Sequence, residues 1–354
     1  AGGGWGVRHF RPAVMGPRVS PVDQLTHGHH TASAILAQEA FSAAGDPNRF
    51  PEQLAFVKPW RPKRLVWNTS PFFFKNRNLP FDPTGLTVME AGSYNPLLGK
   101  AYTEIAAASV SMHKSQGVGS PPRRGARKEY FKLLQGEPMT NSLFEGVDTT
   151  WSRVPNSESI AAEIRQIISK FNPADPPASV PALLKLRQTM SGTKDESWIQ
   201  EKKAELDQII AACLGLHLEA STANETFTPG QTVTIKLEAI NSSNIPVTLH
   251  EAQFSTTADS IKIDAALPSN ELVTKDLSYK IPEATPYSQP YWLRKRGRLG
   301  SFDVDDQKLI GLPANQPAVP VEVLLQVNGQ ELRYLLNTKY RTVAPVAGHR
   351  GRPV

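Results

Sequence analysis

The chain has 354 residues, which is long enough for two or three domains that each have their own core. Hydrophobic residues make up 40% and charged residues 20% of it, and no run of roughly 18 or more apolar residues occurs, so the sequence predicts a soluble globular protein with no membrane span. The formal net charge is +6, but the basic residues are scattered along the chain, so we expect no nucleic-acid partner.

Residues 1–26 come first in chain order and show no clear periodicity. They open with Ala1 and three glycines and lack the apolar core of a signal peptide. We interpret them as an atypical N-terminal segment, either of a fragment or of a chain with a non-native opening. The compartment stays open, and export of a longer protein is one alternative.

The next segment, residues 27–140, predicts an α/β domain. A helix is expected over 31–44, where small and aliphatic residues recur at spacings of three and four, namely Ala32, Ile35, Leu36, Ala40 and Ala43. Short strands are expected over 62–68 and 86–90, and a second helix over 99–116. A doubly wound domain usually begins with strands, which this sequence does not show, so we expect the first half of the domain to be missing.

The rest of the chain predicts a helical segment over 141–215 and a β-sandwich over 216–354. Amphipathic helices are expected over 159–171 and 198–214, on either side of a proline-rich break. Alternating apolar and polar residues then predict strands at 232–240, 260–265, 319–327 and 331–336, with Asn328-Gly329 as a hairpin turn. Residues 348–354 are polar and Gly-rich and show no strand pattern.

Three histidines stand directly before the first predicted helix, at His27, His29 and His30. The positive end of the helix dipole disfavours imidazolium, and neutral imidazole is the form that binds Zn²⁺. The unpaired backbone N–H groups of a helix N-terminus also favour a carboxylate or oxyanion. A surface loop without metal stays open as an alternative, because three ligands from one tetrapeptide cannot close a tetrahedral site.

The segment HGHHTASAILAQEAF at 27–41 resembles the second metal motif of the LmbE-like (PIG-L) family of zinc-dependent N-deacetylases, in which His-x-Asp-His opens a helix. FPEQLAFVKPWRPKRLVWN at 50–68, YNPLLGKAYTEIAAASVSMHKSQG at 94–117 and KEYFKLLQGE at 128–137 are similar to the rest of that catalytic domain in large multidomain bacterial members. The resemblance covers about residues 27–340. It implies a partial Rossmann-like LmbE-type fold for 27–140.

By position, the resemblance implies that His30 is a zinc ligand and that His27 stabilises the oxyanion or protonates the leaving amine. His29 stands where the family has Asp, which normally orients a neighbouring histidine. His113 matches a segment near the end of the domain and, like His29, is a candidate substrate contact; for His113, capping of the helix C-terminal turn is the alternative.

The family's first motif, His-Pro-Asp-Asp followed by Glu, has no match here, because no His-Pro occurs in the sequence. The one paired aspartate, Asp305-Asp306, has no histidine beside it, and we interpret it as a turn. The zinc site is therefore expected to be incomplete in this chain.

The function that the resemblance implies is metal-dependent removal of an N-acetyl group from an amino sugar or glycoconjugate, impaired or absent in this chain alone. The alternative is a non-catalytic β-sandwich that binds a glycan or a protein, beside a vestigial α/β scaffold.

Structural roles are expected for the basic runs, the aromatic residues and the single cysteine. The basic runs at 123–128 and 294–298 are expected to be solvated loops. Packing is favoured over sugar stacking for the aromatic residues Trp60, Trp67, Tyr94 and Phe72–Phe74. The single cysteine, Cys213, excludes an internal disulfide and is expected to be a small buried hydrophobe.

Overall fold

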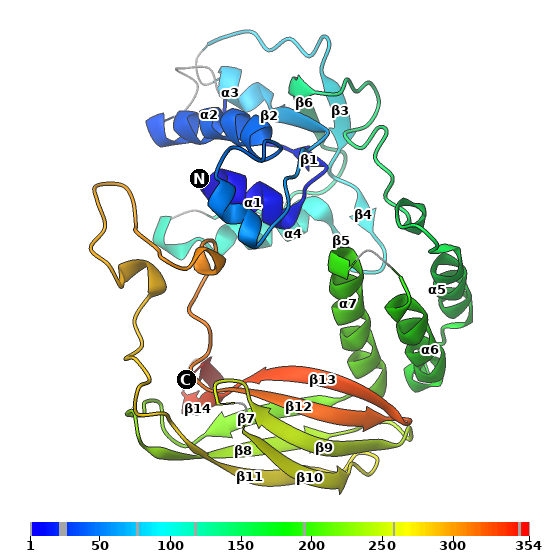
Figure 1. The fold of residues 1–354 in the computed structure, drawn as a ribbon. Coiled ribbons are helices and arrows are strands. Elements are labelled where there is room, and N and C mark those ends of the chain that lie inside the picture. Colours follow the sequence, from blue (N-terminus) through cyan, green and yellow to red (C-terminus); the bar gives the residue numbers. More distant parts are fainter. Residues whose placement is uncertain are drawn as a thin grey trace. The chain divides into compact units, whose positions relative to one another are not determined.

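The computed structural model describes residues 2–20, 27–75, 78–116, 119–193, 196–257, 259–345 and 348–353 (Figure 1). The chain forms two compact units. Unit 1 comprises Ala1–Val147 and Asp305–Leu312, and unit 2 comprises Asp148–Val304 and Pro313–Val354. Helices and several sheets are both present, which confirms the predicted mixture of α and β structure. Within the described ranges, no helix has the length and apolar character needed to cross a membrane.

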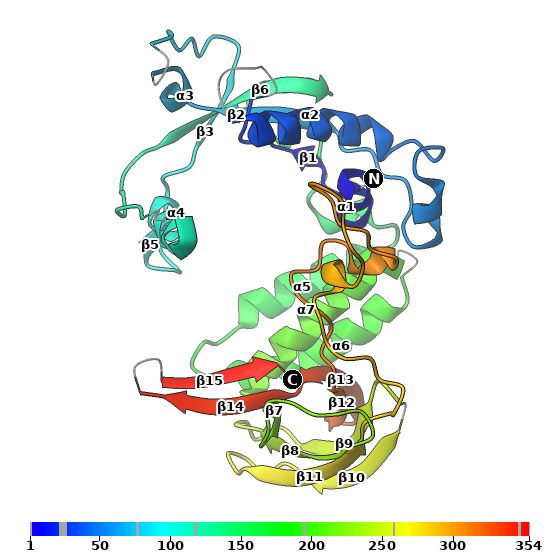
Figure 2. The same cartoon turned by 90° about the vertical axis from the view of Figure 1, so that its left-hand side faces the viewer.

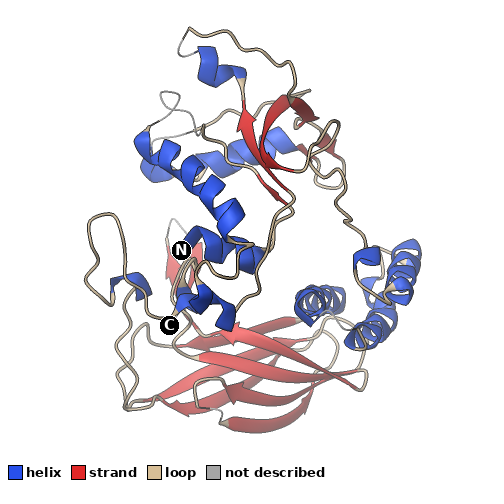
Figure 3. Ribbon diagram, turned by 45° about the horizontal axis from the view of Figure 1, so that its top comes forward, coloured by secondary structure: helices blue, strands red, loops and turns tan. Residues whose placement is uncertain are grey.

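Unit 1 contains helices beside a four-stranded mixed sheet, together with a two-stranded hairpin (Figure 3). Its elements are α1 (Gly2–Phe10), β1 (Val14–Met15), α2 (Gly28–Ala43), β2 (Arg64–Thr69), α3 (Pro71–Lys75), β3 (Thr87–Glu90), β4 (Tyr94–Asn95), β5 (Lys100–Ala101), α4 (Tyr102–Ser111) and β6 (Lys128–Gly136). The sheet has the strand order β1-β2-β6-β3. β1 pairs with β2 in parallel, and β6 pairs with both β2 and β3 in antiparallel fashion.

Helix α2 begins three residues before its predicted start, and it buries only part of the predicted stripe, namely Ala40 and Ala43. The larger residues of the predicted stripe, Ile35 and Leu36, are exposed, whereas Ala40 and Phe41 are buried. The reason is the close approach of α1: a Cβ placed on Gly3 would lie 3.2 Å from the Cβ of Ala40. A Gly-rich helix packs closely only on a small facing residue, so this contact favours burial of Ala40 at the C-terminal half of the stripe.

Between β3 and β6 the chain forms a hairpin and a helix, β4, β5 and α4, which stand apart from the sheet of unit 1 (Figure 2). We call residues 91–127 the hairpin–helix lobe; 117 and 118 lie outside its described part. The helix predicted over 99–116 is shorter, because Lys100 and Ala101 pair with β4 instead. It ends at Ser111, with Met112 as its C-cap.

Unit 2 contains three helices, α5 (Glu158–Lys170), α6 (Val180–Ser191) and α7 (Glu196–Leu214), among its described residues, followed by two sheets. Its strands are β7 (His217–Thr222), β8 (Thr232–Ile240), β9 (Val247–Phe254), β10 (Ser260–Ala266), β11 (Val273–Lys280), β12 (Pro320–Val327), β13 (Gln330–Asn337), β14 (Lys339–Ala344) and β15 (Gly348–Pro353). The sheet orders are β10-β9-β12-β13 and β11-β8-β7-β14-β15. β7 and β14 are a parallel pair.

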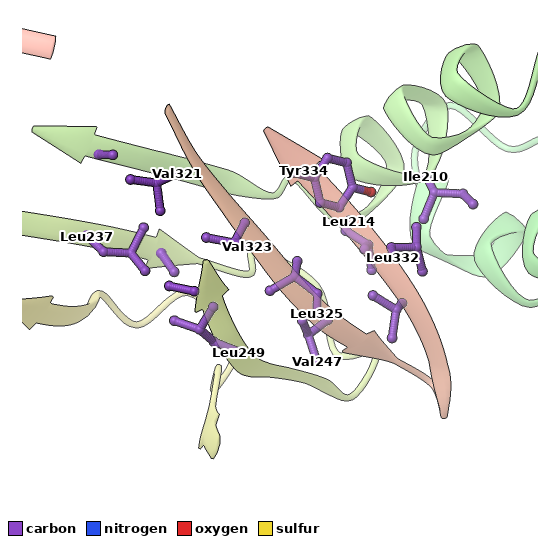
Figure 4. Close-up of a cluster of buried hydrophobic side chains, with 14 of the residues drawn as sticks. Ile210, Leu214, Leu237, Val247, Leu249, Val321, Val323, Leu325, Leu332 and Tyr334 are labelled. Carbon is purple, nitrogen blue, oxygen red and sulfur yellow. The ribbon is translucent and has the colours of Figure 1, made fainter. Parts of the chain in front are cut away.

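The core of unit 2 joins its helices to its sheets. Leu237 on β8, Leu249 on β9 and Leu325 on β12 belong to the same buried cluster as Ile210 and Leu214 on α7 (Figure 4). Burial alternates along β8, as its apolar and polar residues predict. The helices before residue 215 therefore contribute to the core on which the sheets pack.

The first and last described segments of the chain form a helix and a strand that their residue patterns do not predict. Residues 2–10 form α1, which buries Trp5, Val7 and Arg8 although the segment shows no clear periodicity. The interpretation of the last residues as strandless is wrong, because β15 pairs with β14 along its whole length. Cross-strand backbone hydrogen bonds are open to any sequence other than proline, so a polar, Gly-rich strand escapes pattern analysis.

Candidate functional site

The three histidines meet at the N-terminus of α2. His27 is the N-cap residue, with extended backbone angles, and its carbonyl oxygen accepts the N–H groups of His30 at 2.9 Å and Thr31 at 3.1 Å. The His27 and His30 rings are stacked, with centroids 5.8 Å apart, and the His29 ring lies 4.1 Å from the His30 ring. All three residues are exposed.

These rings alone do not fit a zinc site. A structural or catalytic zinc needs at least three protein ligands converging at about 2.0–2.3 Å, most often in tetrahedral geometry. The described part of the chain holds no group of three or more His, Cys, Asp or Glu side chains arranged to hold a metal ion. The cluster consists of three adjacent, exposed imidazoles at the positive end of a helix dipole, where further ligands would have to come from groups outside the cluster.

His113 follows Met112, the C-cap residue of α4, and so lies on a different helix from the other three histidines. Its Nδ1 is 3.2 Å from the carbonyl oxygen of Val110, and its backbone N–H donates to the same oxygen at 3.1 Å. This is the geometry of a histidine that caps a helix C-terminus. Among the described residues, no contact joins His113 to the cluster at His27–His30.

A surface cavity of about 580 Å³ opens in the hairpin–helix lobe, and its lining includes Tyr94 and part of the basic run at 123–128. Tyr94, Glu90, Glu104 and Arg124 line it together with small residues. Backbone N–H groups of Arg127 and Gly92 lower the pKa of Glu90. The N–H of Ala101 and the Arg124 guanidinium lower the pKa of Glu104. Both carboxylates are therefore ionised at neutral pH, and each is already bound to protein donors.

The aromatic residues divide between packing and exposure. Trp67 is buried in β2, and the Trp60 indole donates to the carbonyl oxygen of Pro12 at 2.9 Å. Phe72 and Tyr94 are exposed. Cys213 is partly buried against the core of unit 2, and this burial raises the pKa of its thiol.

The paired aspartates lie in a loop, as interpreted from the sequence. The Asp306 carboxylate accepts the backbone N–H of Lys308 at 3.0 Å, which caps a short 3-10 helix (Gln307–Leu309). Less expected is that this loop belongs to unit 1: the Trp5 indole donates to the carbonyl oxygen of Ile310 at 3.2 Å. Such a contact across most of the chain length has no local sequence signal.

Comparison with known proteins adds little. No protein-family model matches the chain, and no curated protein sequence is similar to it. Among solved structures, the chain resembles Pseudomonas fluorescens alkylpurine DNA glycosylase AlkC bound to DNA containing an abasic site analog, with 11% sequence identity and a TM-score of 0.19. The match spans 46% of this chain and 46% of that one, and a likeness this slight extends neither to fold nor to function.

Proposed function

We propose that this chain contributes His27 and His30 to the active site of an LmbE-like N-deacetylase that acts on an N-acetylated amino sugar or glycoconjugate. The observation that carries the proposal is the stacked pair of exposed imidazoles at the N-cap and first turn of α2. The partial Rossmann-like character of residues 27–140 is part of the same proposal. The sheet of unit 1 supports it with one parallel strand pair, β1 and β2.

In this proposal His30 is a metal ligand, and His27 donates a proton or hydrogen bond to the developing oxyanion or to the leaving amine. Zinc, when bound, would supply Lewis-acid polarisation of the amide carbonyl and of a water molecule. Backbone N–H groups at the N-terminus of α2 would hold the acetate product. Because the sequence has no His-Pro-Asp-Asp motif, further ligands and a general base are required, and we expect the chain alone to be inactive or impaired.

Zinc titration of the purified chain tests the ligand role. A structural zinc site binds with a free energy of about 10–16 kcal/mol, and we expect this chain to bind zinc far more weakly. We expect His30→Ala to lose this weak binding. The matched control is His217→Ala, which removes an exposed histidine of unit 2. Equal zinc affinity of the wild type and His30→Ala would refute the assignment of His30.

Acetate release from N-acetylglucosamine derivatives, together with the zinc content of the purified chain, tests whether the zinc site is incomplete. Stoichiometric tight zinc and measurable acetate release by this chain would show that the site is complete after all. The coding sequence upstream of the codon for Ala1 gives a second readout. A strand followed by His-Pro-Asp-Asp would support the deacetylase, whereas an authentic start codon without that motif would favour a binding module.

A second candidate function is that of a non-catalytic binding module formed by unit 2. Its support is the core of unit 2, whose buried residues all belong to that unit. Binding of the full chain to immobilised glycans tests it: saturable binding that His27→Ala and His30→Ala leave unchanged would favour this candidate over the deacetylase.

A further inference from the structure

The hairpin–helix lobe turns its large apolar side chains outward. Leu97, at the tip of the hairpin, is 95% exposed, and Met112, at the end of α4, is 72% exposed. The other exposed large apolar or aromatic residues of the lobe are Tyr94, Leu98, Tyr102, Ile105 and Val110. Within α4 only Ala107 is buried. An apolar surface of this kind on one small lobe marks an interaction site.

The tip of the lobe is held in a defined conformation. The Asn95 side-chain oxygen accepts the backbone N–H groups of Leu97 at 3.0 Å and Leu98 at 3.2 Å. The Asn95 amide group donates to the Tyr102 hydroxyl at 3.0 Å, which ties the turn to the first residue of α4. The two leucines are thus presented to solvent on a braced turn, and ordering them costs little when they bind.

The same lobe has an excess of basic over acidic residues. About a tenth of the sequence, residues 91–127, contains one acidic residue, Glu104, and five basic ones: Lys100, Lys114, Arg123, Arg124 and Arg127. The lobe therefore has a net charge of +4, against +6 for the whole chain. This concentration of charge is a local property that the average composition conceals.

The basic loop is attached directly to the apolar hairpin and helix. The Thr103 hydroxyl donates to the carbonyl oxygen of Arg123 at 2.6 Å, and the Arg124 Nε donates to Glu104 Oε1 at 2.8 Å. Both contacts join residues 123–124 to the first turn of α4. The cations and the exposed leucines are therefore carried on one structural element.

We propose that the hairpin–helix lobe docks on the surface of an anionic lipid bilayer. The leucines of the tip enter the boundary between headgroups and acyl chains, and Tyr94 and Tyr102 lie at headgroup level, where amphipathic rings are favoured. Lys100, Lys114 and Arg123 bind lipid phosphates while their aliphatic stems cover apolar surface, whereas Arg124 and Arg127 are ion-paired with Glu104 and Glu129. A lipid surface fits better than a nucleic acid, because the tip is aliphatic and nucleic acids are bound by stacking on aromatic rings. The proposal is independent of the deacetylase.

Flotation of the full chain with vesicles tests the proposal. One vesicle type contains phosphatidylcholine alone, and the other contains phosphatidylcholine with about one third phosphatidylglycerol. We expect binding to the anionic vesicles only, weakening as salt is raised. Combined Leu97→Ser and Leu98→Ser is expected to weaken binding about tenfold per leucine. Its matched control, Leu272→Ser with Leu299→Ser, removes two exposed leucines of unit 2 and is expected to change nothing.

A second variant tests the charge. Lys100→Gln, Lys114→Gln and Arg123→Gln together are expected to weaken binding about a hundredfold. The control with the same loss of charge is Arg165→Gln, Lys170→Gln and Lys185→Gln, on exposed positions of α5 and α6. Far-UV circular dichroism checks that each variant is folded.

Four results would overturn the proposal. The first is a folded wild type that stays in solution with anionic vesicles, and the second is equal binding by the leucine variant and its control. The third is binding to a DNA duplex that depends on the lobe's cations, without any binding to vesicles, which would assign the lobe to nucleic acid. Dimerisation that the leucine variant abolishes, without vesicle binding, would likewise assign the surface to a second copy of the chain.

Discussion

Arg8 is fully buried in unit 1, and its guanidinium binds neutral acceptors around the C-terminus of α2. Its nitrogens donate to the Gln53 side-chain oxygen and to five backbone carbonyl oxygens, those of Ala43, Ala44, Asp46, Arg49 and Phe50, at 2.7–3.3 Å. Carbonyl oxygens at a helix end have no intrahelical donor. One side chain from α1 therefore satisfies the end of α2 and the turn that follows it.

We expect Arg8→Met to destabilise unit 1 by about 3 kcal/mol, because several buried carbonyl oxygens lose their donor at once. The control Arg123→Met removes an exposed guanidinium of the same unit and is expected to cost less than about 0.5 kcal/mol. Denaturant unfolding of the unit measures both. A loss as small as that of the control would mean that water replaces the guanidinium at these oxygens.

Tyr334 provides a residue-scale prediction about pH. Its hydroxyl donates to the carbonyl oxygen of Asp207 at 2.9 Å, and burial, together with the Asp207 charge, raises its pKa. A raised pKa in the folded state stabilises the protein fully below the ordinary value of 10.0, and this contribution is lost as the pH rises above it. Tyr334→Phe is therefore expected to cost about 1 kcal/mol near neutral pH, and less above about pH 10.

Urea midpoints of the wild type and Tyr334→Phe at about pH 8 and about pH 11 measure how far the difference in stability between the two proteins decreases with pH. The comparison uses the difference between the two proteins, so that other groups titrating in the same range cancel. Tyr287→Phe, at an exposed phenol, is the control. A difference that stays constant over this range would contradict a raised pKa for Tyr334.

At the scale of elements, the N-terminus of α2 is capped poorly for stability. His27 makes no side-chain capping hydrogen bond, and the first turn contains no acidic residue. Serine at an N-cap accepts an N–H of the first turn, and acidic residues there interact favourably with the helix dipole. A helix start that lacks both of these stabilising interactions is more consistent with a role in binding than with a role in folding.

His27→Ser is accordingly expected to raise the stability of unit 1 by about 1 kcal/mol, because its hydroxyl supplies the missing cap. His27→Ala, which has no acceptor, is expected to lie within about 0.5 kcal/mol of the wild type. Thermal and denaturant unfolding distinguish the two. Destabilisation by both substitutions would show that the stacked imidazoles support the helix.

Elements with strong local signals are predictable from this sequence. Strand β8 has the predicted bounds, and the Asn328-Gly329 turn has positive φ at both residues, 46° and 81°, as a two-residue hairpin of this sequence requires. Helix α1, by contrast, is formed against its glycine content, because it packs on the alanines of α2. Its stability comes from tertiary contacts, which local propensity does not contain.

The candidate site was predictable to a similar degree. The adjacency of His27, His29 and His30 follows from their spacing at a helix start, and the structure brings the three rings together. The cavity of the hairpin–helix lobe was not predictable. Gly92 packs so closely that a Cβ there would lie 2.1 Å from the carbonyl oxygen of Gly125, a long-range backbone contact with no local pattern.

At the scale of the whole molecule, unit 2 has a self-contained core. The buried cluster runs from Ile160 on α5 to Tyr334 on β13 and includes no residue of unit 1. Burial of apolar surface is the dominant favourable term in folding, and a unit that holds its own core can fold alone. The helices α5, α6 and α7 are needed for this, because Ile210 and Leu214 close the core over the sheets.

We therefore expect a fragment comprising residues 148–354 to fold cooperatively on its own. Leu237 is fully buried, and Leu237→Ala is expected to cost about 2–5 kcal/mol through the cavity that it creates. If the core is self-contained, this cost is the same in the fragment as in the full chain, because no neighbour of the cavity is missing. Denaturant unfolding of the fragment and of the full chain, each with and without Leu237→Ala, measures this cost. A fragment that binds hydrophobic dye and melts without a transition, or a much smaller cost within it, would show that unit 2 needs unit 1 in order to pack.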